Sequence, residues 1–243
     1  MQPAADVMPE PFGKKLGAIV YIHGWQGSAQ AVMRFSALTK VAKELGVFLI
    51  APQGLDKSWS IPKAFEQKRD DVAFIENVIE DSIRRFPIDR SKIMISGFSL
   101  GGSMTWYIAC ARGNKYAGYA PIAGAFWLPY PQSCKAPISN LFHVHGLKDK
   151  MVPMKGRQVT SSARQGDVLH SFRMLAKVNN CKTKPIDLPE NSSLTPAQNL
   201  KCHKASCQKS FIELCLHDGG HSVKPQWIVR AWKMLQQKNG WKS

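Results

Sequence analysis

The 243-residue sequence has no apolar run as long as the roughly 18 residues that a membrane-spanning helix needs. It also has no low-complexity tract and no internal repeat, which argues against a disordered or solenoid protein. No helix-turn-helix, zinc-finger or other nucleic-acid-binding signature is present, so we do not expect nucleic acid as a partner. With 44% hydrophobic residues the chain can build one well-packed core, and we expect a single domain over residues 1–243.

Acidic residues are scarce, since 17 Asp and Glu face 33 Lys and Arg and leave a formal net charge of +16. No acid occurs from Arg90 to Lys148, and none occurs after Asp218. Such an imbalance attracts anionic partners or substrates and raises the rate at which they meet the protein. A basic surface that only keeps the protein in solution is the alternative, and the composition favours neither.

Cysteine is sparse as well. Six cysteines are too few for a disulfide scaffold but enough for one or two bridges in an exported protein. The cysteines and histidines between residues 202 and 217 do not have the spacing of a standard zinc finger, so we expect no metal. Cys110 falls in a predicted buried helix and is expected to be a free thiol. The first ten residues lack the basic and apolar regions of a signal peptide.

Short apolar runs alternate with longer periodic segments, a pattern typical of a parallel sheet with helices on both faces. The polar stretch 179–209 is predicted to be a long surface excursion. Helices, with apolar residues three or four apart, are predicted at 70–86, 100–112, 168–178 and from 225 onward. Strands are predicted at 16–23, 47–51, 93–96, 119–122, 141–144 and 211–216.

The segment Gly97-Phe-Ser-Leu-Gly101 matches the pattern G-x-S-x-G between a predicted strand and a predicted helix. A sharp strand-to-helix turn needs glycine on either side of the serine, because a Cβ there would collide with backbone. The turn lifts the serine above the sheet edge, and the amide of Leu100, at the helix start, can stabilise an oxyanion. A capping serine in a glycine-rich turn is the alternative, because the short pattern alone is modest evidence.

A serine hydroxyl needs a neighbouring base, and in such sheets the partners follow in the order Ser, acid, His. Asp149 and His221 each lie just past the carboxyl end of a predicted strand, the edge where such sites form. We therefore predict Ser99 as nucleophile, His221 as base and Asp149 as the acid that orients the base. Asp167, Asp187 and Asp218 are weaker candidates for the acid, and His143, His145 and His217 are predicted to be structural.

The loop Ile22-His-Gly-Trp-Gln-Gly27 follows the first predicted strand and can donate a second oxyanion amide. The amide of Trp25 is the first choice and that of Gln26 the second, and Gln26 is also a candidate substrate contact. His23 is predicted to be structural. Trp59 and Trp127 are loop aromatics that can line a substrate groove, with plain packing as the alternative.

Taken together, these motifs resemble the secreted polyhydroxybutyrate depolymerase and feruloyl esterase group of α/β hydrolases, sometimes labelled LpqC-like. Two positions depart from that group. Trp25 stands where a cysteine is common, and Val223 stands where the group usually has Trp-Pro after the histidine motif. The stretches that carry the resemblance are Tyr21–Ser28, Asp70–Ile75, Pro87–Ile93, Gly97–Gly102, His145–Asp149 with Val152-Pro153, and Gly219–Ser222.

The resemblance implies an α/β-hydrolase fold and a serine esterase that cleaves a small or polymeric ester through an acyl-enzyme, without metal or cofactor. The positive charge would suit an anionic substrate. Because the group also resembles poly(aspartic acid) hydrolases, amide hydrolysis of an anionic polymer is the alternative, and an inactive polymer-binding module is the alternative from another class. The resemblance also implies a bond from Cys181 to Cys207 or Cys202, and a secreted or periplasmic location with the signal peptide absent from this sequence.

Overall fold

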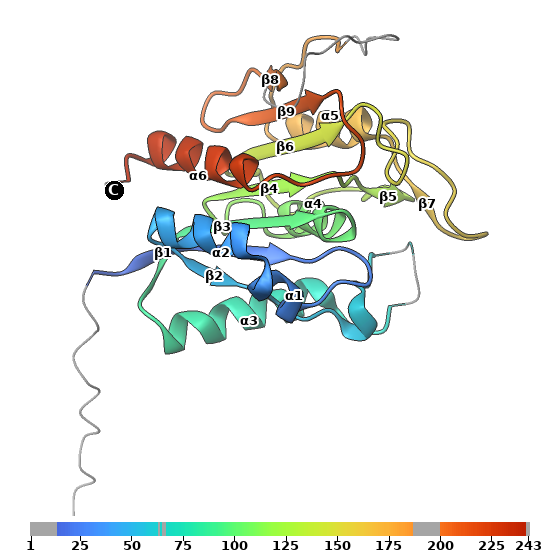
Figure 1. Ribbon diagram of the computed structural model, residues 1–243. Coiled ribbons are helices and arrows are strands. Elements are labelled where there is room, and N and C mark those ends of the chain that lie inside the picture. The colour runs from blue at the N-terminus through green and yellow to red at the C-terminus, as the bar shows by residue number, and fades with distance from the viewer. Residues whose placement is uncertain (1–13, 63, 65–66, 187–199, 242–243) are drawn as a thin grey trace, which may run out of the picture.

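A computed structural model describes residues 14–62, 64, 67–186 and 200–241 (Figure 1). The strands of its central sheet are β1 (Leu16–Ile22), β2 (Phe48–Ile50), β3 (Ile88–Phe98), β4 (Gly118–Ile122), β6 (Leu141–Gly146), β8 (Lys201–Ala205) and β9 (Ile212–His217). Their order across the sheet is β2-β1-β3-β4-β6-β9-β8. All neighbours are parallel except β8, which is antiparallel to β9.

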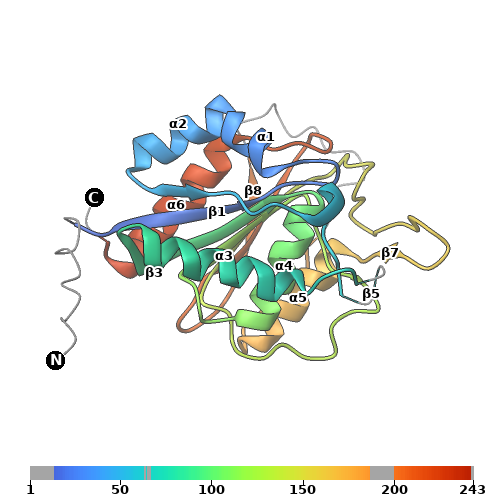
Figure 2. The ribbon, with the colours of Figure 1, turned by 90° about the horizontal axis from the view of Figure 1, so that it is seen from below.

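Two groups of helices cover the two faces of this sheet (Figure 2). On one face lie α1 (Ala29–Arg34), α2 (Ser36–Leu45) and α6 (Pro225–Asn239), and on the other lie α3 (Asp71–Arg85), α4 (Leu100–Arg112) and α5 (Val168–Val178). The predicted mostly parallel sheet with helices on both faces is therefore confirmed. A turn of 3₁₀ helix, η1 (Leu55–Lys57), and a short ladder between β5 (Trp127–Leu128) and β7 (Arg164–Gln165) complete the described elements.

The central strands are buried because both of their faces are covered. Every residue of β1 after the first is buried, and β6 and β9 are buried along their whole length. A strand without a solvent face has no need of alternating polar residues, which explains the continuous apolar runs in the sequence. The buried polar residues on β6 and β9 are therefore notable, and they are His143, His145, Glu213 and His217.

Capping residues set the helix boundaries. The Asp70 carboxylate accepts a hydrogen bond from the Ala73 N–H at 3.0 Å, which fixes the start of α3. Pro225 occupies the first turn of α6, where its missing N–H costs nothing, and Gly240 ends that helix in the left-handed conformation.

The stretch 179–209 is only partly the predicted excursion. Residues 201–205 form β8, which closes one edge of the sheet against β9. Its Lys-rich composition is typical of an edge strand, where the outer face meets water. Residues 187–199 of the predicted excursion lie outside the described part of the chain.

All six cysteines are paired, so the prediction that Cys110 is a free thiol is wrong. The loop after β5 returns to the end of α4, where the Lys135 N–H donates to the Cys110 carbonyl oxygen at 3.0 Å and Cys134 reaches the helix. Of the two pairings that the resemblance allowed for Cys181, the structure contains the one with Cys207. The disulfides are Cys110–Cys134, Cys181–Cys207 and Cys202–Cys215.

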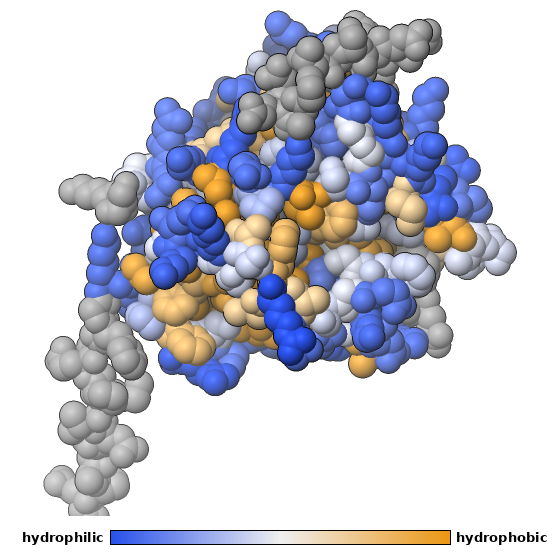
Figure 3. Space-filling view, viewed as in Figure 1, coloured by the Kyte–Doolittle hydropathy of each residue, from blue (hydrophilic) through white to orange (hydrophobic). Residues whose placement is uncertain are grey.

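The face of the molecule seen in Figure 3 is mostly hydrophilic, with hydrophobic residues exposed in patches between the polar ones. Within the described ranges, no helix is long and apolar enough to cross a membrane.

Candidate active site

Ser99 lies in the turn between β3 and α4, with a φ of 59° and a ψ of −120°. Residues other than glycine rarely adopt such a φ, and the conformation costs free energy. The Ser99 N–H donates to the carbonyl oxygen of Ile122 at 3.0 Å, which ties the strained turn to β4. A strained serine held by its surroundings in this way points to a function for the turn.

The glycines on either side of Ser99 cannot carry a side chain. A Cβ at Gly97 would lie 2.4 Å from the Gly101 carbonyl oxygen, and one at Gly101 would lie 2.1 Å from that of Ile22. Both collisions are with backbone, so no side-chain rotation could relieve them. Among the described residues, Ser99 makes no side-chain capping hydrogen bond with α4, which speaks against an ordinary capping serine.

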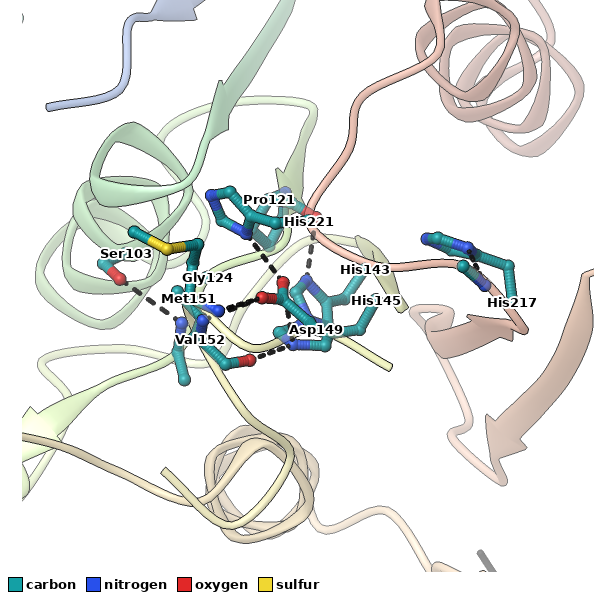
Figure 4. Close-up of polar contacts among 12 residues, drawn as sticks. Ser103, Pro121, Gly124, His143, His145, Asp149, Met151, Val152, His217 and His221 are labelled. Atoms are coloured by element: carbon teal, nitrogen blue, oxygen red, sulfur yellow. Dashed lines mark hydrogen bonds and ion pairs between the residues drawn. The ribbon is translucent and has the colours of Figure 1, made fainter. Parts of the chain in front are cut away.

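His221 and Asp149 meet at the carboxyl edge of the sheet (Figure 4), where His221 Nδ1 lies 2.7 Å from Asp149 Oδ2. The Asp149 side chain is fully buried, and its Oδ1 accepts hydrogen bonds from the Met151 and Val152 N–H groups, each at 2.8 Å. Burial would raise the pKa of Asp149, but the His221 contact and the Val152 N–H hold that pKa below its ordinary value. Because an ionised carboxylate only accepts, Nδ1 of His221 is the donor, and in the neutral ring Nε2 then has the lone pair.

Ser99 and His221 line one cavity of about 850 Å³. Its walls are mainly apolar, and they include several of the large apolar side chains that the described residues expose to solvent. An exposed apolar cluster around a cavity is typical of a ligand site. The exposed apolar residues that line the cavity are Trp25, Leu55, Met151 and Val159.

The two predicted oxyanion donors lie at this cavity, Leu100 at the start of α4 and Trp25 in the loop after β1. Neither N–H makes a hydrogen bond within the part of the chain that the structure describes. The second choice, the amide of Gln26, is wrong, because that N–H donates to the Lys57 carbonyl oxygen at 2.8 Å. Gln26 is also not among the residues that line the cavity, so its proposed substrate contact is not supported.

Trp59 and Trp127 form fixed walls of the cavity. Nε1 of Trp59 donates to the His23 carbonyl oxygen at 2.8 Å, and Nε1 of Trp127 donates to Ser103 Oγ at 3.2 Å. Both indoles are almost completely buried, so they pack and line the cavity at the same time. His23 is structural, because its Nε2 accepts from the Gly54 N–H at 3.0 Å and so holds the loop.

The other described candidate acids have other partners. Asp167 caps α5, and Asp218 forms an ion pair with a surface lysine. Asp187 lies outside the described residues. Asp149 is the candidate whose carboxylate lies at hydrogen-bond distance from a His221 ring nitrogen, at 2.7 Å.

The described residues offer few groups of side chains that could bind a metal ion. The one group of possible ligands that lie close together is Cys202, Glu213 and Cys215. A disulfide joins the two cysteines, which removes both thiolates.

Two basic residues at the cavity were not predicted. Arg157 lines it, with Nε donating to the Met151 carbonyl oxygen at 2.9 Å, and Lys68 lines it while paired with Asp56 at 2.8 Å. Neither residue belongs to a motif, and the overall positive charge was the only signal in the sequence that could have suggested them.

Several known proteins with similar sequences are named esterases. Residues 60–175 match the phospholipase/carboxylesterase family. A probable feruloyl esterase C of Aspergillus niger is 26% identical over 198 residues, covering 82% of this chain and 65% of that protein. A putative esterase NocK of Nocardia uniformis is 30% identical over 160 residues, covering 63% of this chain and 45% of that protein. The chain thus spans less than two thirds of the length of these curated relatives.

Solved structures show the same fold at low identity. A phospholipase/carboxylesterase from Dyadobacter fermentans has a TM-score of 0.57 at 16% identity, covering 91% of this chain and 90% of that chain. A carboxylesterase from Bacillus cereus has a TM-score of 0.57 at 10% identity, covering 92% of this chain and 89% of that chain.

The sheet order, the serine turn at the end of β3 and these structural likenesses show an α/β-hydrolase fold. The match of residues 60–175 to the phospholipase/carboxylesterase family and the distant similarity to proteins named feruloyl esterases confirm that part of the resemblance.

Proposed function

We propose that this protein is a serine hydrolase that cleaves carboxylic esters through an acyl-enzyme. One observation carries the proposal: a serine in a strained strand-to-helix turn and a histidine held by a buried carboxylate line the same cavity. Strain and a buried charge both cost stability, and their coincidence at one cavity is typical of a catalytic site.

In the proposed reaction, Ser99 Oγ attacks the ester carbonyl carbon while His221 Nε2 takes the hydroxyl proton. The Leu100 and Trp25 N–H groups stabilise the oxyanion of the tetrahedral intermediate. His221 then gives its proton to the leaving alcohol, and water repeats the sequence to release the acid. Asp149 keeps the imidazole in the required tautomer and balances its charge when it is protonated.

The shape of the cavity supports an ester with a sizeable apolar or aromatic group. A volume of about 850 Å³ accommodates a group of the size of a typical small ligand. The indoles of Trp25, Trp59 and Trp127 supply flat apolar surface against which a ring can pack. The names of the feruloyl esterase relatives support an aromatic acyl group, and an aliphatic polyester is compatible with the same walls.

A second candidate is amide hydrolysis of an anionic polymer such as poly(aspartic acid). The basic side chains of Arg157 and Lys68 at the cavity and the net charge of +16 favour it. The third candidate, an inactive polymer-binding module, would have the same cavity without turnover.

We also propose a secreted or periplasmic location. Three disulfides that use all six cysteines are typical of proteins that fold in an oxidising compartment.

A fluorophosphonate probe tests the proposal directly. It should label the wild-type protein on Ser99 and fail to label the Ser99→Ala variant, whereas Ser58→Ala, which changes another serine of the same cavity, should keep the label. The unlabelled enzyme is screened in parallel on p-nitrophenyl, feruloyl and polyester substrates beside poly(aspartic acid). Turnover of poly(aspartic acid) alone would favour the second candidate, and absence of both label and turnover would favour the binding module. Ester turnover above about one hundredth of wild type in Ser99→Ala would overturn the assignment of the nucleophile.

A further inference from the structure

Two buried histidines of β6 lie behind Asp149, on the side away from His221 (Figure 4). Nδ1 of His143 lies 2.8 Å from the Pro121 carbonyl oxygen, and its Nε2 lies 3.1 Å from Nδ1 of His145. Nε2 of His145 lies 2.8 Å from the Val152 carbonyl oxygen. All four ring nitrogens of the pair are therefore engaged in three contacts at hydrogen-bond distance.

The three contacts require three protons. A carbonyl oxygen only accepts, so the outer nitrogen of each ring has to donate. The inner contact, between His143 and His145, needs a further proton on one of its two nitrogens. Two neutral imidazoles carry only two protons, so a neutral pair would leave one contact with two lone pairs facing each other. Both rings are completely buried and have no access to solvent, so such a contact would stay unsatisfied.

Burial opposes the third proton, because it lowers the pKa of both rings. The Asp149 carboxylate acts in the other direction, with its Oδ2 at 3.7 Å from His145 Nε2. The carbonyl contacts favour the protonated form as well. His217 on β9 and His221 after it are the other titratable groups that act on His145, and both oppose a charge when protonated. From α4, the uncharged ring of Trp106 packs against the pair.

We propose that His143 and His145 share three protons and together form a positive counter-charge that holds the Asp149 carboxylate in place for His221. Neither histidine touches the reacting atoms, so both are positioning residues. The inference rests on the proposed function for its effect on catalysis, since a positive charge behind Asp149 opposes protonation of His221. The base then stays available at lower pH than it would beside a neutral pair.

A count of histidine nitrogens in the wild-type protein tests the proton number without any substrate. In a sample labelled with ¹⁵N-histidine at pH 8.5, two-bond ¹H–¹⁵N correlations separate protonated nitrogens from those with a lone pair. The sequence has seven histidines, so seven neutral rings give seven lone-pair nitrogens, and a pair with one extra proton gives 7 − 1 = 6. A count of six supports the proposal and a count of seven overturns it, whether or not the protein hydrolyses esters.

The variant His143→Gln tests the effect on the base, and His217→Gln is its matched control because it also removes a buried, neutral histidine on the neighbouring strand. The acidic limb of kcat/KM should move up by about one pH unit in His143→Gln, which loses the counter-charge. It should stay in place in His217→Gln, which loses no charge. An unmoved limb in His143→Gln, or equal shifts in both variants, would overturn the role in catalysis. If His143→Gln does not fold, the nitrogen count on the wild-type protein decides.

Discussion

Replacing Asp149 with asparagine changes one atom of the site and should reverse the tautomer of the base. In the Asp149→Asn variant, the amide oxygen can take the position of Oδ1 and keep both hydrogen bonds from the Met151 and Val152 N–H groups, which lie at 2.8 Å. The amide NH₂ must then face His221 Nδ1, which lies 2.7 Å from Asp149 Oδ2. Because the NH₂ group only donates, Nδ1 has to accept, and the imidazole proton moves to Nε2.

A histidine protonated at Nε2 cannot take the proton of Ser99. We therefore expect Asp149→Asn to lower kcat by about 10³ to 10⁴, which corresponds to about 4 to 5.5 kcal/mol of activation free energy. KM should change little, because the side chain at this position is buried and does not line the cavity. The assay is steady-state hydrolysis of a p-nitrophenyl ester at pH 8, with the melting temperature measured beside it to show that the variant is folded.

Asp218→Asn is the matched control, since Asp218 lies only three residues from His221 and pairs with Lys148 near the surface. Ion pairs of this kind contribute about 0 to 1 kcal/mol, and activity should stay within about twofold of wild type. If Asp149→Asn kept more than about a tenth of the wild-type activity, or if Asp218→Asn caused the same loss, the assignment of the orienting acid would be refuted.

Ester hydrolysis should fall as the pH drops from 8 to 5, because the histidine has to be neutral to act as base, while the lowered pKa of Asp149 keeps that carboxylate ionised; a flat profile would contradict a histidine base. Mass spectrometry of an unreduced digest should find Cys181 linked to Cys207, and a free Cys181 thiol in protein made under oxidising conditions would remove the argument for export. Arg157→Gln should lower kcat/KM at low salt by about threefold to tenfold for an anionic ester but not for a neutral ester of equal size. That difference should shrink near 0.15 M salt, where the Debye length is about 8 Å. If the ratio of kcat/KM for the anionic and the neutral ester did not change with salt, the charge would not steer the substrate.

The sequence predicted the features that depend on local chemistry. The buried strands were readable because parallel strands covered on both faces need continuous apolar runs. The meeting of Asp149 and His221 at one edge of the sheet could be predicted, because each residue closely follows such a strand and parallel strands bring their carboxyl ends to one edge. The sharp turn at Ser99 could be predicted from Gly97 and Gly101, because a side chain at either position would collide with backbone.

Features that depend on tertiary contacts were not predicted. β8 is polar and pairs on one side only, so its residues carry no apolar pattern. α1 was missed because it has only six residues and one buried side chain, Val32. α2 was also missed, although its apolar residues have helical spacing and Gly46 ends it, so that signal was present in the sequence. The bond between Cys110 and Cys134 depends on where a loop returns, which sequence spacing does not determine. For the same reason, nothing placed Arg157 at the cavity.

β4 carries no proposed catalytic side chain, but it connects the two parts of the site. β4 lies between β3, which ends at the nucleophile turn, and β6, which leads to the acid. Its Ile122 carbonyl oxygen accepts from the Ser99 N–H at 3.0 Å, and its Pro121 carbonyl oxygen is 2.8 Å from His143 Nδ1. Proline is unusual in a central strand because it cannot donate to the ladder. Two adjacent carbonyl groups of β4 thus hold the strained serine on one side and the histidine pair behind Asp149 on the other. A local change in this backbone would disturb the contact to the serine turn, the contact to the histidine pair, or both, so the position of the nucleophile relative to the acid depends on β4.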